Sequence, residues 1–317
     1  MENKEACPIK KTSIGGQALI EGVMMRGPSR TAMAVRHVSG EIVMEEWDNP
    51  QNTRPKWTKW PIIRGLFNFV DSMRVGYKCL MRSAELSGLE EEEGKDKAPD
   101  PAQEKKESAI FKAVMVIGTV LGILLAMVLF MWLPIQLFSW LSAAFPWLEK
   151  PYLRGIFEGV LRILIFLAYM LLVSRMKDIR RTFQYHGAEH KSIFCYEKGL
   201  PLTVENVREQ RRFHPRCGTS FMILMLLVGI IISILIPIQT PILRTAIKLL
   251  LLPLSVGIGY ELIKLAGRRD NRFTRFISAP GVWMQHITTK EPDDGMIECA
   301  IASLKAVIPE DPESDQW

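Results

Sequence analysis

Apolar residues are concentrated in a few long runs along the chain, and two of these runs are almost free of charge. Residues 110–133 contain one charged side chain, Lys112, and residues 219–237 contain none. A hydrocarbon layer about 30 Å thick needs roughly 20 apolar helical residues to cross it. Both runs are therefore predicted to be membrane-spanning helices.

Two further apolar runs carry charged residues. Residues 155–174 include Glu158 and Arg162, and residues 245–265 include Lys248. Charged side chains near the ends of a span can reach the interface by snorkelling, so both runs are predicted to span and the total is four. Glu158 and Arg162 lie four residues apart, which predicts an ion pair on one helix face near the outer interface. The charge-free third span argues against a transport path.

Lysine and arginine are unevenly distributed between the predicted loops. Residues 175–218 hold ten of them, whereas residues 134–154 hold two and residues 238–244 hold one. Because cytoplasmic loops are enriched in these residues, both termini and the central loop are predicted to be cytoplasmic. The net charge of +6 then reflects topology, and no nucleic-acid partner is expected. Five cysteines on the reducing side argue against a disulfide framework.

The first third of the chain is expected to lie outside the membrane. The stretch AMAVRHVSGEIVMEEW predicts a β-hairpin, and the glycine-rich stretch before it predicts one more short strand, so residues 13–60 are expected to form a small cytosolic β element. Residues 61–88 change to a helical period. Their apolar stripe comprises Ile63, Leu66, Val70, Met73, Tyr77, Leu80 and Ala84. This amphipathic helix either lies in the membrane interface or packs on the rest of the protein.

The remaining segments complete the predicted organisation. Residues 89–108 are rich in charge and predict a disordered linker. Residues 109–274 form the expected four-helix membrane domain, with the lysine- and arginine-rich loop as its cytosolic part. In the cytosolic tail, residues 275–317, we expect a turn at Pro280-Gly281 and a final helix from about Asp293. The predicted fold class is an α-helical membrane protein with a small β element.

The candidate chemistry centres on the stretch from His186 through Glu189 to His190. No glycine or proline interrupts residues 175–185, so the second span is predicted to continue as a helix into the cytosol. Positions four apart then lie on one face, where two imidazoles can hold one ion, and Glu189 lies beside them as a further ligand or a general base. The order His-x-x-Glu-His is that of the inverted zinc-peptidase motif. Alternatively, the two histidines are core residues satisfied by backbone carbonyls or a carboxylate.

A third ligand is available in the stretch FHPRCGTSF, which contains His214 and Cys217 at the cytosolic mouth of the third span. Thr219 or Ser220 can cap that helix, which leaves Cys217 just ahead of its positive end. Such a position lowers a thiol pKa and favours a thiolate, either as a metal ligand or as a nucleophile assisted by His214. The structural alternative is a turn at His-Pro-Arg, with Cys217 as a packing residue.

Three polar residues of the glycine-rich first block, Gln17, Glu21 and Arg26, are further candidates. Glu21 could complete a metal shell, and Arg26 could pair with an anionic head group or a carboxylate. The favoured alternative is that the glycines serve tight turns and that Glu21 and Arg26 form a salt bridge with each other.

Four blocks of the chain resemble one family of bacterial membrane proteins. The blocks GGQALIEGVMMRGP, YHGAEHKSIFCYE, HPRCGTSF and PGVWMQHITTKEPDD are similar to the YqhQ family, and the resemblance covers residues 13–308 without the acidic linker. The resemblance implies a polytopic inner-membrane protein of unassigned function. It also implies dependence on a metal, because the histidine-rich blocks have led to that label for the family. It supplies neither a reaction nor a substrate.

Two hypotheses from different classes follow. The first is a metal-dependent enzyme, a hydrolase at the cytosolic membrane face that uses zinc or another divalent transition metal. Its ligands would be His186, His190 and either His214 or Cys217, with Glu189 as the base. The second is a non-catalytic membrane factor that partners the protein translocation, insertion or quality-control machinery. Its basis is the large cytosolic surface and the lack of a recognisable substrate-cavity signature. The lipid bilayer is a partner in both hypotheses.

Overall fold

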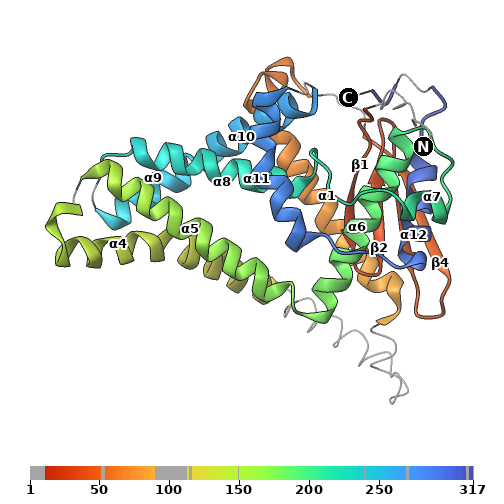
Figure 1. Cartoon of the computed structure of the whole chain (residues 1–317), viewed down its shortest axis with the longest axis horizontal. Helices are drawn as coiled ribbons and strands as arrows, with labels where there is room; N and C mark the ends of the chain where they lie inside the picture. Colours follow the sequence, from red (N-terminus) through yellow and green to blue (C-terminus); the bar gives the residue numbers. More distant parts are fainter. Residues whose placement is uncertain are drawn as a thin grey trace, which may run out of the picture. The chain divides into compact units, whose positions relative to one another are not determined.

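The computed structural model describes most of the chain, which forms two compact units (Figure 1). The described residues are 11–50, 54–89, 113, 116–148, 150–238, 240–268, 271–311 and 314–316. The sheet unit comprises Met1–Glu90, Leu171–Leu224 and Gly257–Trp317, and the helical unit comprises Glu91–Met170 and Met225–Val256. The disordered linker predicted at residues 89–108 lies, except for Leu89, outside the described residues.

The sheet has four antiparallel strands in the order β1-β2-β3-β4. Their bounds are Gly15–Leu19 for β1, Gly22–Arg26 for β2, Arg30–Arg36 for β3 and Ile42–Asp48 for β4. The predicted hairpin is the β3–β4 pair, but the block before it holds two strands and not one. The two strands are joined by Ile20 and Glu21, and Glu21 has a φ of 50°. Two-residue hairpin loops need such positive φ values and usually contain glycine, asparagine or aspartate. The pair Ile-Glu contains none of these, so the sequence did not predict this turn.

Helices cover both faces of this sheet, so the unit has three layers (Figure 1). On one face lie α6 (Lys177–Glu197) and α12 (Asp294–Val307), and the main hydrophobic core lies between them and the strands. On the other face lies α1 (Ile63–Ser87) with a smaller core. The predicted final helix is confirmed as α12, whose N-cap Asp293 accepts a hydrogen bond from the Met296 backbone N–H at 2.9 Å.

Helix α1 is confirmed as a helix, but its predicted apolar stripe is not its main buried face. The fully buried positions are the small residues Gly65, Gly76, Cys79, Ser83 and Ser87. Small residues let the helix lie very close to its neighbours: a Cβ on Gly76 would lie 2.2 Å from the Gln17 side-chain oxygen. In contrast, Val70, Met73 and Tyr77 are each more than half exposed.

Three described helices are long and apolar enough to cross a membrane, and one bent pair adds a possible fourth. The three are Val116–Ala144, Leu153–Val173 and Gly218–Leu235, the last being α8. The bent pair consists of α9 (Pro241–Leu250) and α10 (Leu252–Arg268), which meet at 45°. These helices are compatible with the predicted membrane protein, and the fourth predicted span is broken and not straight.

Three predicted boundaries are wrong. The first long helix does not end at Pro134. A π-helical segment, η2 (Val128–Trp132), leads directly into α4 (Leu133–Ala144), and Pro134 lies in the first turn of α4. The predicted turn at Pro280-Gly281 lies inside α11 (Arg272–Thr288), where a Cβ on Gly281 would lie 2.5 Å from Ser220 Cα.

The second span does not continue into α6. Helix α5 (Pro151–Val173) ends where the Ser174 hydroxyl donates a 2.8 Å hydrogen bond to the Leu171 carbonyl oxygen. Met176 is extended, and α6 starts at Lys177. The short elements that complete the described chain are η1 (Lys56–Lys59), η3 (Pro146–Leu148) and α7 (Val204–Arg208).

The helical unit contains a buried group of charges centred on Glu158. Glu158 is fully buried and accepts hydrogen bonds from Arg154 at 2.9 Å, from Arg244 at 3.1 Å and from Lys248. The predicted Glu158–Arg162 ion pair is wrong, because the Arg162 Nε donates to the Phe130 carbonyl oxygen at 2.7 Å. Glu158 therefore joins α5 to α9, and it is not a snorkelling charge.

Candidate metal centre

Two histidines and one cysteine converge in the sheet unit. His186 and His190 come from α6, and Cys217 directly precedes α8. One ligating atom from each residue lies within 4.8 Å of the other two. The His186 Nε2 atom is 3.1 Å from the Cys217 sulfur, and the centroids of the two imidazole rings are 4.4 Å apart. His190 and Cys217 are buried, and His186 is half-buried.

Backbone carbonyls orient both imidazoles. The His186 Nδ1 atom lies 2.8 Å from the Thr288 oxygen, and the His190 Nδ1 atom lies 2.5 Å from the Arg212 oxygen. Because a carbonyl can only accept, both Nδ1 atoms act as donors, and each Nε2 atom is left to face the centre. The Nε2 atom of His190 is buried without a hydrogen-bond partner in the described part of the chain. Such an atom is costly to bury unless something else binds it.

The electrostatics of the cluster favour a thiolate at Cys217. Burial alone would raise the pKa of the Cys217 thiol, but the imidazoles of His186 and His190 outweigh burial and hold that pKa well below its usual value. Burial works in the opposite direction at His186, where the thiolate overcomes it and raises the pKa to about 9. The Thr219 backbone N–H also points at the sulfur, at 3.4 Å. A thiolate is the form of cysteine that binds metal.

Glu189 lies next to this cluster but outside the group of three. Its carboxyl group is buried, and burial raises its pKa more than the neighbouring imidazoles lower it. The Gly16 backbone in β1 also lowers this pKa, by a smaller amount than the imidazoles do. Gly16 is needed there because a Cβ at this position would lie 2.9 Å from the Glu189 carboxyl carbon. Glu189 is therefore a buried carboxyl group beside the cluster and is not one of its three members.

His214 has a different set of partners. Its Nε2 atom lies 3.6 Å from a Glu197 carboxylate oxygen and 3.3 Å from the Arg216 guanidinium, while its backbone N–H donates to the Gln285 side chain at 2.7 Å. Burial lowers the His214 pKa to about 4. Of the two residues considered as a third ligand, the structure brings Cys217 to the histidine pair and leaves His214 in a neighbouring polar network.

The low pKa of His214 predicts a pH-dependent stability. An unfolded histidine titrates near pH 6.5, so between about pH 6.5 and 4 the unfolded chain binds a proton that the folded chain does not. Stability should fall with falling pH across this window, by up to about 3 kcal/mol. We expect His214→Gln to flatten the pH profile of the melting temperature there, and the exposed His286→Gln to leave it unchanged. Equal slopes in all three proteins would contradict a neutral buried His214.

Glu21 and Arg26 do not pair with each other, so the predicted salt bridge is wrong. Glu21 makes a two-point ion pair with Arg181 and lies 3.2 Å from the Tyr185 hydroxyl oxygen. These contacts tie the β1–β2 turn to α6 and place Glu21 outside the ligand group. The Arg26 side chain makes no hydrogen bond or ion pair with another residue that the structure describes.

Several contacts that build the centre have no side-chain signature. The carbonyl groups of Thr288 and Arg212 orient the histidines, yet any residue type could supply them. Gly16 and Gly187 are the residues from which part of this packing could have been predicted, because a glycine inside a strand or helix often marks a close backbone approach. At Gly187 an added Cβ would lie 2.0 Å from the Lys290 oxygen.

The fold and site describe a mostly helical protein with candidate membrane spans, a small antiparallel sheet and a buried His/Cys cluster. The family model described as Protein of unknown function (DUF1385) matches residues 60–310. The chain is 35% identical over 300 residues to the Uncharacterized protein YqhQ of Bacillus subtilis (strain 168), which covers 93% of this chain and 92% of that protein. The chain therefore belongs to the DUF1385 family, and the resemblance to YqhQ proteins is confirmed. No solved structure matches it.

Proposed function

We propose that this protein is a metal-dependent hydrolase of the cytosolic membrane face, with its ion held by His186, His190 and Cys217. The observation that carries the proposal is the pair of carbonyl-anchored imidazoles, both of which present Nε2 to one point beside a thiolate. Histidine ligands of metals are commonly oriented in this way through the other ring nitrogen. The buried and unpartnered Nε2 of His190 would then gain a ligand.

The donor set fits zinc. Two imidazoles and one thiolate supply three protein ligands, the number found in catalytic zinc sites with one open position. A divalent cation held there would act as a Lewis acid toward a substrate carbonyl or phosphoryl oxygen. Glu189 would accept and return the proton in the reaction, since its carboxyl group lies in the same buried region as the ligands.

A thiol nucleophile is the second candidate. The 3.1 Å contact between His186 Nε2 and the Cys217 sulfur is of the kind made by a cysteine and its activating histidine. In this arrangement the histidine that assists Cys217 is His186, whereas His214 was predicted from the sequence. It uses His186 and Cys217, and His190 only helps to lower the Cys217 pKa, so the buried His190 Nε2 is left without a partner in the described part of the chain. For this reason we rank it second.

Exposed apolar surface supports a position at the membrane. Besides the stripe of α1, helix α11 exposes Phe273, Phe276 and Trp283, and it is the next helix after α10, the second helix of the bent pair. Aromatic side chains next to arginines are typical of helices in the membrane interface. With the lysine and arginine bias of the loops, these features support a multi-pass inner-membrane protein with cytosolic termini. A non-catalytic role beside translocation, insertion or quality-control proteins would use the same surface.

Metal analysis of the purified protein tests the proposal. We expect about one zinc or other transition-metal ion per wild-type chain, and far less in His190→Ala and Cys217→Ser, whose missing ligands weaken binding. His286→Gln, which changes an exposed histidine, should keep the wild-type content. Wild-type protein that takes up no transition metal would end the metal proposal. Loss of function on alkylation of Cys217 in such protein would favour the thiol nucleophile, and unchanged function would favour the non-catalytic role.

A further inference from the structure

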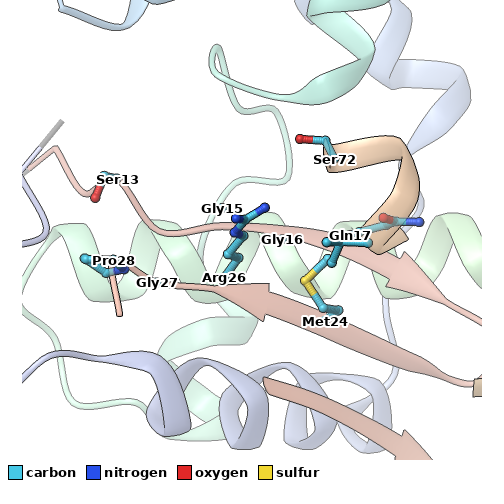
Figure 2. A pocket seen from close by; sticks show the side chains of 10 residues that line it. Ser13, Gly15, Gly16, Gln17, Met24, Arg26, Gly27, Pro28 and Ser72 are labelled. Carbon is cyan, nitrogen blue, oxygen red and sulfur yellow. The ribbon is translucent and has the colours of Figure 1, made fainter. Parts of the chain in front are cut away.

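A polar cavity on the α1 face of the sheet is separate from the histidine cluster. Its volume is about 340 Å³, and it is lined by β1, β2, the segment after β2 and α1. Ser13, Gln17 and Ser72 contribute polar groups to its wall, and Arg26 is the one charged residue that lines it. Figure 2 shows the Arg26 side chain reaching across β1 at Gly15, between Ser13 on one side and Gln17 and Ser72 on the other.

The strand pairing explains why this arginine is available. Gly15 lies directly opposite Arg26 in the β1–β2 ladder. Side chains at directly opposed positions interact, but a glycine offers none, and the space where its Cβ would lie is open. The predicted partner, Glu21, is bonded to Arg181 instead. Arg26 is thus a guanidinium over an open cavity, with no ion pair to any residue described in the structure.

We infer that this cavity binds the phosphate group of a small molecule or of a lipid head group. A guanidinium presents a fork of N–H donors that matches phosphate oxygens, and the hydroxyls of Ser13 and Ser72 add neutral donors from opposite walls. Met24 and Val75 give the cavity an apolar side that suits the carbon part of a ligand. The volume admits a head group or a small metabolite.

The cavity also borders the candidate centre. Gly16 lines it, and the same residue contacts Glu189 from the opposite face of β1. A bound phosphate would therefore lie one strand away from that carboxyl group. The inference does not depend on a metal, because no residue of the cluster takes part in the binding.

Direct binding measurements test this inference. The full-length protein in phosphatidylcholine nanodiscs is titrated by calorimetry with inorganic phosphate and, separately, with short-chain phosphatidic acid. Arg26→Gln removes the charge, and Gly15→Glu fills the open place with a carboxylate that pairs with Arg26. Each should weaken binding about tenfold or more. Arg30→Gln is the matched control, since this arginine lies on the neighbouring strand and is already paired with Glu46 and Asp48.

Each outcome decides a point. Binding of both probes supports a site for phosphate itself, and binding of phosphatidic acid alone supports a lipid head-group site. The inference is overturned if the wild-type protein binds neither probe, or if Arg26→Gln binds as tightly as the wild-type protein does. Melting curves of Arg26→Gln and Gly15→Glu show that a lost signal reflects the site and not unfolding. Gly15→Glu provides the second variant, because its side chain enters open space.

Discussion

Glu158→Gln should destabilise the helical unit by about 3–5 kcal/mol, because it removes the one carboxylate that faces three buried cations. Arg154, Arg244 and Lys248 each bond to Glu158 and are almost fully buried. A neutral amide of the same shape keeps the packing and removes the compensating charge. The expected result is a large fall in the melting temperature of the detergent-solubilised protein and in its yield.

The three cations are not equivalent, and this gives the experiment an internal check. Arg244 also donates to the carbonyl oxygens of Ser233 and Ile236, at 2.9 and 2.6 Å, so it remains bonded when Glu158 is lost. The Lys248 ammonium has only the carboxylate as a partner within the described chain. The double variant Glu158→Gln/Lys248→Gln should therefore recover part of the lost stability.

A surface carboxylate provides the comparison. Glu298 pairs with Arg36 and is about half exposed, so Glu298→Gln should cost less than about 1 kcal/mol. If Glu158→Gln were as mild as Glu298→Gln, the buried charge cluster would not exist in the folded protein. A double variant less stable than Glu158→Gln would show that Lys248 is stabilised by something other than this carboxylate.

The sequence predicted the elements best where the physical signal was continuous. Long apolar runs and a three-four repeat identify helices because hydropathy and helical period extend over many residues, as in α8, α1 and α12. It failed where a single residue was taken as a boundary. Pro134 and Pro280 are both helical, since a π-helical segment or tertiary packing accommodates the missing N–H, while α5 ends at Val173 without any proline or glycine.

For the predicted site too, contacts within one helix were predictable from the sequence, and contacts between distant segments were not. His186 and His190 share a helix face through local geometry alone, so α6 places them together although it is not a continuation of α5. Whether Cys217 or His214 faces them depends on how α8 and α11 pack, which no local pattern encodes. The same holds for Glu21, whose partner Arg181 is far away in the sequence.

Gly187→Ala should disrupt the candidate centre without changing any of its ligands. A Cβ at this position would lie 2.0 Å from the Lys290 carbonyl oxygen, which belongs to the backbone and cannot rotate away. The backbone from Thr288, the last residue of α11, to Lys290 must then move off α6. It makes two contacts: the Lys290 N–H donates to the Phe183 oxygen at 2.8 Å, and the Thr288 oxygen accepts from His186 Nδ1 at 2.8 Å.

Both consequences of Gly187→Ala can be measured. Alanine normally favours a helix interior over glycine by up to about 1 kcal/mol, but here overpacking should destabilise the protein by about 1–3 kcal/mol, so the sign is opposite to helix propensity. Loss of the Thr288 anchor should also weaken zinc affinity in a chelator competition by about 10- to 100-fold. Gly218→Ala is the matched control: it makes the same change next to Cys217, where an added Cβ meets nothing within 4 Å. A stabilised Gly187→Ala protein with unchanged zinc affinity would show that the backbone at Lys290 does not hold His186 in place.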